Sequence, residues 1–225
     1  MIIRSILKLR VIYAILFLAL VVWWFPLLWL ILTSVRELSD TLAYPPVWIF
    51  TPTLEHYVTV FHDSYFIQAL INSIITATSS TGIVLFIAIP AAYVLARYDF
   101  KNLEFYIIST KMTPPIVILF ASYLMFFQLG LLQTRSALII LHIAFNLPLG
   151  VWLLKGFFQN IPVEIEDAAQ IDGCNQWQVI TSIVVPLTLP GIFITGILCF
   201  MFSWMEFLFA STITGGQSLT VPVMV

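Results

Sequence analysis

Long, continuous apolar runs limit what this 225-residue chain can fold into more than any other feature of its sequence. Only 9% of the residues are charged and 61% are hydrophobic, whereas a soluble domain carries about 25% charged residues. A run of about 20 apolar residues crosses a bilayer as a helix. The runs are continuous and do not alternate as the strands of a membrane barrel do. The sequence therefore predicts an all-α polytopic membrane protein.

The apolar runs predict five membrane spans and the opening of a sixth. The expected spans are 11–33, 68–95, 105–128, 136–157 and 187–212, and residues 220–225 begin a sixth that the chain does not complete. The first run is longer than the apolar part of a signal peptide, so we expect an uncleaved span preceded by residues 1–10. The pair Pro114-Pro115 is expected to break or kink the third span.

The positions of lysine and arginine predict the orientation, because cytoplasmic loops carry an excess of both. Under alternating topology, six of these residues fall on one side: Arg4, Lys8, Arg10, Arg97, Lys101 and Lys155. Arg36 and Arg135 fall on the other side. We therefore expect a cytoplasmic N-terminus, a periplasmic loop at 34–67 and a cytoplasmic loop at 158–185.

The loop at 158–185 is the long polar stretch of the second half and is predicted to hold two short helices. Negative charge at the start of the first helix suits the positive end of its dipole; the residues are Glu164, Glu166 and Asp167. Gly173 can adopt the left-handed conformation that ends a helix. Pro186 then helps to guide the chain back into the membrane.

Two interpretations of this loop follow from its residues alone. It is either an amphipathic connector on the membrane surface or a helix that docks into a cleft of another protein. Surface helices usually carry lysine and arginine, which anionic lipid attracts, but residues 156–191 contain neither. The acidic charge favours docking and leaves the connector as the alternative.

The loop resembles the EAA loop of the inner-membrane permeases of binding-protein-dependent ATP-binding-cassette (ABC) importers. The family pattern is Glu-Ala-Ala, three residues, Gly, nine residues, Ile, one residue and Leu-Pro. This chain reads Asp167-Ala168-Ala169, Gly173, Ile183 and Val185-Pro186, so the spacing matches and two positions differ conservatively. Further similarity to the carbohydrate-uptake branch, the maltose-type permeases, lies at Pro162, Glu164, Glu166, Asp172-Gly173, Asn146-Leu147-Pro148, residues 152–158, Trp204 and Glu206-Phe207.

This resemblance implies a type I ABC importer transmembrane domain of six-helix design in a bacterial inner membrane, with the last span incomplete here. The chain would form half of the path for a sugar, polyol or glycoside. Asp167 would contact an ATPase, Ala168 and Ala169 would allow close approach, and Gly173 would set the angle between the two helices. The full set expected to couple to the ATPase is Glu164, Glu166, Asp167, Ala168, Ala169, Asp172, Gly173, Ile183 and Pro186.

The resemblance also implies the partners. They are an ABC ATPase dimer, a second homologous permease and a periplasmic or lipid-anchored solute-binding protein, with membrane lipid around the spans and no nucleic acid. The chain lacks the G-x-x-x-x-G-K-[ST] phosphate loop. We therefore expect no enzyme activity, catalytic residue or cofactor in this chain, with ATP and magnesium handled by the partner ATPase. Cys174 and Cys199 have no metal-ligand spacing, and no metal site is expected.

Polar residues inside the predicted spans are the remaining candidates for function. Glu206 is the one acid inside a span, where an acid is costly, and His142 and Asn146 lie one turn apart. Each could line the solute path or make hydrogen bonds between helices. Lys111 is expected to extend its amine towards the cytoplasmic interface.

Two other classes of protein are weighed against the permease. A membrane-embedded enzyme needs ionisable residues gathered at one depth, and only Glu206, His142 and Lys111 are available. A secondary transporter would show inverted repeats and more intramembrane acids, and the sequence has no evident internal repeat. The identity of the solute is not readable from these residues.

Overall fold

The computed structural model describes residues 2–224, without the side chains of residues 2–8 and 11. The side chains of Arg4 and Lys8, used above for the predicted cytoplasmic N-terminus, lie outside this description, as does Val225 of the predicted sixth span. The chain divides into two compact units, Met1–Asp63 and Ser64–Val225. Each unit is described by itself.

The first unit consists of α1 (Ile2–Ser34), α2 (Leu38–Thr41) and α3 (Glu55–His62). Helix α1 contains the predicted span 11–33 and leaves its apolar side chains exposed, with Trp23 81% exposed. A hydrophobic surface on every side suits a helix that is surrounded by lipid.

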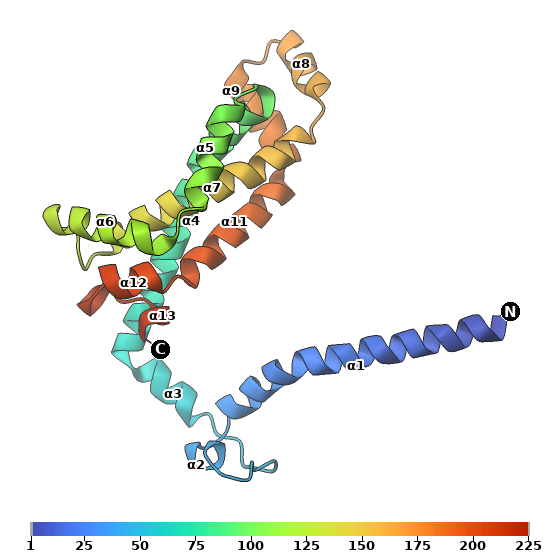
Figure 1. The fold of residues 1–225 in the computed structure, drawn as a ribbon, viewed down its shortest axis with the longest axis vertical. Helices are drawn as coiled ribbons and strands as arrows, with labels where there is room; N and C mark the ends of the chain where they lie inside the picture. Colours follow the sequence, from blue (N-terminus) through green and yellow to red (C-terminus); the bar gives the residue numbers. More distant parts are fainter. Residues whose placement is uncertain (1, 225) are drawn as a thin grey trace. The chain divides into compact units, whose positions relative to one another are not determined.

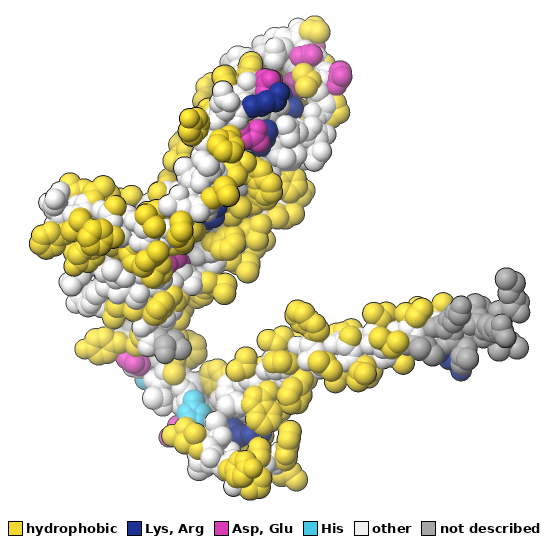
Figure 2. All heavy atoms as spheres, viewed as in Figure 1, with side chains coloured by type: hydrophobic (Ala, Val, Ile, Leu, Met, Phe, Trp, Pro, Cys, Tyr) yellow, Lys and Arg dark blue, Asp and Glu magenta, His cyan; other side chains and the backbone are white. Residues whose placement is uncertain are grey.

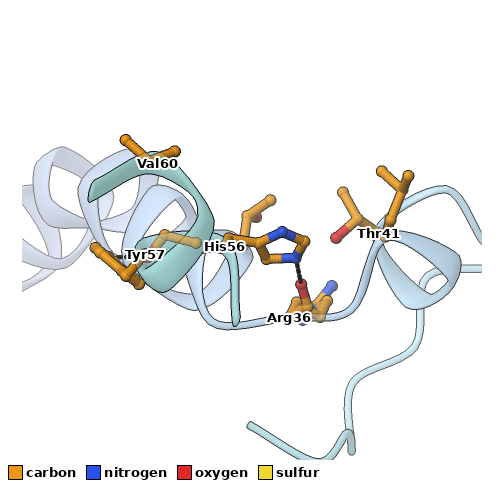
Figure 3. Close-up of a pocket in the computed structure, with 8 residues that line it drawn as sticks. Arg36, Thr41, His56, Tyr57 and Val60 are labelled. Atoms are coloured by element: carbon orange, nitrogen blue, oxygen red, sulfur yellow. Dashed lines mark hydrogen bonds between the residues drawn. The ribbon is translucent and has the colours of Figure 1, made fainter. Parts of the chain in front are cut away.

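A pocket of about 360 Å³ lies between the end of α1 and α3 (Figure 3). The ring Nε2 of His56 donates to the carbonyl oxygen of Arg36 at 2.9 Å. The Arg36 guanidinium is buried within cation–π distance of Trp29 and Phe50, at 5.2 Å and 4.4 Å from their ring centroids. These contacts order the polar segment that the sequence analysis places in the 34–67 loop.

The regular elements of the second unit are all helices among its described residues, and the longest, α4, α7 and α11, run through it (Figure 1). Its elements are α4 (Ser64–Arg97), α5 (Lys101–Lys111), α6 (Pro115–Gln128), α7 (Arg135–Gln159), α8 (Val163–Ile171), α9 (Gln176–Val179), the π-helical turn η1 (Ile180–Val184), α10 (Val185–Leu187), α11 (Leu189–Trp204), α12 (Leu208–Ile213), the 3-10 turn η2 (Gly216–Ser218) and α13 (Val221–Met224). Helices α8 and α9 lie at one end of the unit, and α12 and α13 lie at the other.

Small side chains let the three long helices approach closely. The buried face of α4 carries Ala69, Ser73, Ala77, Ser80, Ala88 and Ala92. On α7, a Cβ added at Gly150 would lie 2.9 Å from Val84 Cγ1 and 3.9 Å from the sulfur of Cys199, which belong to α4 and α11. Close packing of this kind holds helices together in lipid, where burial of apolar surface gives no advantage.

Two predicted spans are broken in the structure. The range 105–128 corresponds to α5 and α6, which are bent by 86° at the Pro114-Pro115 break. The range 187–212 contains a second break, which the sequence analysis did not predict, because α11 ends at Trp204 and α12 begins at Leu208. The carboxylate of Glu206 binds the first amides of α12 and so favours a new helix start at this point.

The surface of the second unit matches helices that cross a membrane. Among the described residues, three helices are long and apolar enough to do so: α4 and α7 of this unit and α1 of the first unit. The number rises to five if two bent pairs, α5 with α6 and Gln176–Leu187 with α11, each form one span. Figure 2 shows hydrophobic side chains over the middle of the second unit, whereas lysine, arginine and acidic side chains gather at the end that carries α8. The charged end is therefore the end suited to water.

Candidate functional site

The segment between α7 and α11 folds into two short helices joined at a glycine. Gly173 has a φ of +92°, and its N–H donates to the carbonyl oxygen of Gln170 at 3.0 Å, which ends α8. Asn175 then starts α9 with a capping box: its side chain accepts from Gln178 N at 3.0 Å, and Gln178 Oε1 accepts from Asn175 N at 2.7 Å. The spacing Asn-x-x-Gln carried this second signal in the sequence, and the sequence analysis missed it.

One face of α8 points away from the bundle and is free to contact another protein. The predicted coupling residues exposed on α8 are Glu164, Asp167 and Ala168, and Asp172 and Gly173 are exposed directly after it. Pro186, also exposed, lies on α10. Ile171 adds an apolar side chain that is 87% exposed. An exposed helix face that combines acidic residues, an alanine and an isoleucine can offer both polar and apolar contacts to a partner.

The opposite face of α8 packs onto the ends of α4 and α7. Ala169 is 8% exposed and belongs to the same apolar cluster as Phe158 of α7 and Ala92 of α4. Val179 and Val184 extend this cluster along the following turns, and the half-buried Ile183 packs against it. The two short helices are therefore attached to the bundle.

Besides Ala169, Glu166 is a predicted coupling residue that the structure turns inward, and it is only 2% exposed. Its Oε1 accepts from Nε of Arg97 at 2.9 Å, and the same oxygen pairs with Arg97 Nη2. Its Oε2 accepts from the hydroxyl of Tyr93 at 2.6 Å. Both oxygens are thus engaged within the chain, so Glu166 does not present its carboxylate to a partner as the exposed Glu164 and Asp167 do, and its part in coupling to an ATPase stays a prediction.

Arg97 and Tyr93 connect α4 to three parts of the loop. Besides Glu166, Arg97 Nη2 donates to the carbonyl oxygen of Ile161 at 3.2 Å, and Gln176 Nε2 of α9 donates to the Tyr93 hydroxyl at 2.7 Å. Sequence reasoning used Arg97 only to predict orientation and did not consider Tyr93 or Gln176. The partners are 64 to 83 residues apart in the chain, so no local pattern could have paired them.

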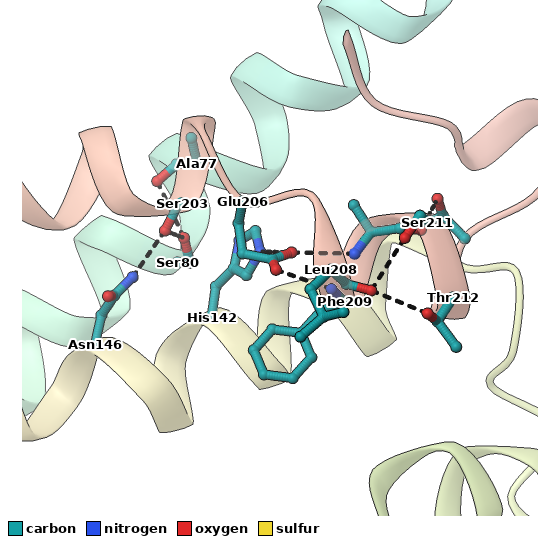
Figure 4. Close-up of polar contacts among 12 residues, drawn as sticks. Ala77, Ser80, His142, Asn146, Ser203, Glu206, Leu208, Phe209, Ser211 and Thr212 are labelled. Carbon is teal, nitrogen blue, oxygen red and sulfur yellow. Dashed lines mark hydrogen bonds and ion pairs between the residues drawn. The ribbon is translucent and has the colours of Figure 1, made fainter. Parts of the chain in front are cut away.

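A second polar group lies inside the bundle, where the structure brings His142 and Glu206 together (Figure 4). His142 Nε2 lies 3.7 Å from Glu206 Oε2. The two carboxylate oxygens of Glu206 also accept from the backbone amides of Phe209 at 2.8 Å and Ala210 at 3.0 Å. Glu206 is therefore at a helix break and fixes the start of α12.

Asn146 makes a separate contact between helices. Its Nδ2 donates to the hydroxyl oxygen of Ser203 at 2.9 Å, and the Ser203 and Ser80 hydroxyls are 3.1 Å apart, so α4, α7 and α11 are joined at this level (Figure 4). Lys111 does not extend to an interface as expected, because its amine donates to the carbonyl oxygen of Phe145 at 2.9 Å.

The contacts of His142, Asn146 and Glu206 join helices, and they do not form a reaction centre. His142 and Asn146 are 3% and 2% exposed, and Glu206 uses both oxygens to bind the backbone of α12. Among residues 2–224, no three His, Cys, Asp or Glu side chains come close enough to hold a metal ion. What the arrangement offers is a set of attachments between helices and a protruding loop.

The family model and the curated relatives both show the family to which this chain belongs. Residues 85–225 match the family described as "Binding-protein-dependent transport system inner membrane component". The chain is 37% identical over 204 residues to the "Probable ABC transporter permease protein y4oR" of Sinorhizobium fredii, covering 90% of this chain and 74% of the relative. It is 35% identical to the "Sulfoquinovosyl glycerol transport system permease protein SmoH" of Agrobacterium fabrum, covering 88% and 72%.

A solved structure shares the fold. It is a bacterial ABC transporter involved in the import of the acidic polysaccharide alginate. One of its chains superposes with a TM-score of 0.78 over 98% of this chain and 79% of that chain, at 22% identity. The type I ABC importer permease fold expected from the sequence is therefore confirmed.

Proposed function

Because the chain belongs to the inner-membrane components of binding-protein-dependent transport systems, we propose that it carries a sugar, polyol or glycoside through the membrane as one permease subunit of an ATP-driven importer. The names of its relatives support this solute class, since one of them is a permease for sulfoquinovosyl glycerol. The observation that carries the proposal is the α8 loop, which protrudes from the charged end of the second unit with Asp167 and Ala168 outward.

The outward face of α8 is the proposed docking surface for the ATPase. Glu164, Asp167 and Asp172 would meet basic or polar groups of the ATPase, and Ala168 would allow its surface to come close. Gly173 would set the angle of the following turn. Ile183, half-buried against the bundle, would support this surface from behind, and the exposed Pro186 would help to guide the chain back towards the membrane.

The proposed complex contains an ABC ATPase dimer, a second homologous permease and a periplasmic or lipid-anchored solute-binding protein. The ATPase would bind and hydrolyse ATP with magnesium, and this chain would bind no cofactor. The proposed orientation has the N-terminus and α8 in the cytoplasm and residues 34–67 in the periplasm. The excess of lysine and arginine on the α8 side supports it.

For the solute path we propose an indirect role for His142, Asn146 and Glu206. Their contacts join α4, α7, α11 and α12, so they would hold the shape of the path wall. Glu206 would matter most, because it determines where α11 ends and α12 begins.

The test is ATP hydrolysis by the complete complex, reconstituted in proteoliposomes with its solute-binding protein. We expect at least one member of a panel of sugars, polyols and glycosides to stimulate hydrolysis and to be taken up. The carbohydrate assignment would be contradicted if no member of the panel stimulated ATP hydrolysis and a solute of another class did. A purified chain that associates with no ATPase would contradict the permease assignment itself.

A further inference from the structure

Two clusters of polar residues, one near each end of α4, bond this helix to other segments of the chain. The first, called here the α8 clamp, consists of Glu166 on α8 with Arg97 and Tyr93 on α4. Side-chain exposures of 10% for Arg97 and 3% for Glu166 show that water hardly reaches the ion pair. A buried, charge-assisted pair with two donors from one guanidinium fixes direction as well as distance. Apolar packing, which also holds α8, has no such direction.

The second cluster, called here the Asn72 clamp, lies near the other end of α4 and holds residues 217–221. Asn72 Nδ2 donates to the carbonyl oxygens of Gln217 at 2.8 Å and Leu219 at 2.7 Å. The backbone N–H of Val221 donates to the hydroxyl of Ser73 at 2.9 Å. The Asn72 side chain is fully buried, so its two hydrogen bonds to this segment are shielded from water.

Helix α4 joins the two clamps without interruption. It runs for 34 residues and continues through Pro90, so at about 1.5 Å per residue it is about 50 Å long. The α8 clamp involves its last turns and the Asn72 clamp its third turn. A displacement of α8 therefore reaches residues 217–221 through one helix and two sets of buried hydrogen bonds.

We infer that α4 transmits movement between the docking loop and residues 217–221, through the α8 clamp at one end and the Asn72 clamp at the other. The inference rests on the proposed function, in which an ATPase moves α8. It makes Glu166, Arg97 and Asn72 positioning residues that touch neither ATP nor solute. Coupling between distant sites requires such a connected element whose position both sites influence.

The first test is a distance measurement on the complete complex. Spin labels are attached at Ile171→Cys on α8 and Phe86→Cys on α4, both exposed positions, in a background carrying Cys174→Ser and Cys199→Ala. The distance is measured without nucleotide and with nucleotide trapped in a closed ATPase dimer. We expect the same distance in both states, because α8 and α4 move together. A distance that changes on closure would overturn the inference without any need for a clamp variant.

The second test separates transmission from assembly. We expect Glu166→Gln and Asn72→Leu each to lower uptake per ATP hydrolysed by roughly two- to thirtyfold, the range seen for changes along coupling networks. The ATPase should still copurify with both variants. The charge swap Arg97→Glu with Glu166→Arg should recover part of the loss.

The matched control is a second ion pair, between Lys155 of α7 and Glu104 of α5, which does not involve α8. Glu104→Gln should leave uptake per ATP unchanged. An equal loss in this variant, or wild-type uptake per ATP in Glu166→Gln, would contradict the inference. Failure of the proposed function would look different, because the wild-type complex would then show no solute-stimulated hydrolysis at all.

Discussion

Substitution of Gly173 changes the turn that separates α8 from α9, and the structure allows its cost to be worked out. Its φ of +92° lies where side chains are disfavoured, yet a Cβ built there meets nothing within 4 Å. The cost of Gly173→Ala is therefore conformational, about 1–2 kcal/mol. Gly173→Asn should cost less, because asparagine enters this region more readily.

Gly173→Pro should be the most damaging of the three changes. Proline fixes φ near −65° and has no N–H, so the hydrogen bond to Gln170 is lost together with the turn, at a cost of about 3 kcal/mol or more. If docking requires the native turn, the cost of about 1–2 kcal/mol for Gly173→Ala weakens ATPase binding by at most about 5- to 30-fold, and the larger cost of Gly173→Pro weakens it further. Insertion of the spans should be unaffected, because the turn lies outside them.

The assay is the affinity of the detergent-solubilised permease for its ATPase, measured by titration, with uptake in proteoliposomes alongside. We expect the loss of ATPase affinity and of uptake to be greatest in Gly173→Pro, smaller in Gly173→Ala and smallest in Gly173→Asn. Gly156→Ala is the matched control, since Gly156 lies inside α7 with open space around it and an ordinary φ. Undiminished ATPase affinity and uptake in Gly173→Pro would refute the reasoning, as would a loss in Asn greater than in Ala.

Three further predictions concern packing and the helix break. Gly191→Ala places a Cβ 2.4–2.7 Å from the Phe157 ring, so it should lower the stability measured by thermal unfolding in detergent by about 1–3 kcal/mol. Adding Phe157→Leu should restore part of that stability, and an unchanged stability in Gly191→Ala would refute the close contact. Asn146→Leu should cost about 1 kcal/mol in the same assay, by removal of its bond to Ser203, and an unchanged midpoint would contradict this. Glu206→Ala should speed hydrogen exchange at the amides of residues 209 and 210, whereas wild-type protection there would exclude the capping role.

The parts of the fold that depend on local chemistry could be predicted from the sequence. Apolar runs indicated the spans, the Pro114-Pro115 pair indicated the broken third span, and Gly173 indicated the end of α8, where the structure has a positive φ. Each of these signals acts within one or two turns of the chain. They do not require knowledge of which helices become neighbours.

The unpredicted parts depend on contacts between distant residues. Glu164, Glu166 and Asp167 look alike in the sequence, and only the position of Arg97 on α4 shows that Glu166 points inward. The break before α12 was missed because Glu206 lies in an apolar run that reads as one span. The bonds from its carboxylate to the next turn become visible only in three dimensions.

Site-specific photo-crosslinking from the loop tests the central claim most directly. A photoreactive residue in place of Ile171, which is 87% exposed at the end of α8, should crosslink to the co-expressed ATPase in intact cells. The same residue in place of Phe86, 80% exposed in the middle of α4, should not. A permease whose Ile171 position crosslinks only to lipid or to periplasmic proteins, in a complex that transports solute, would contradict the account.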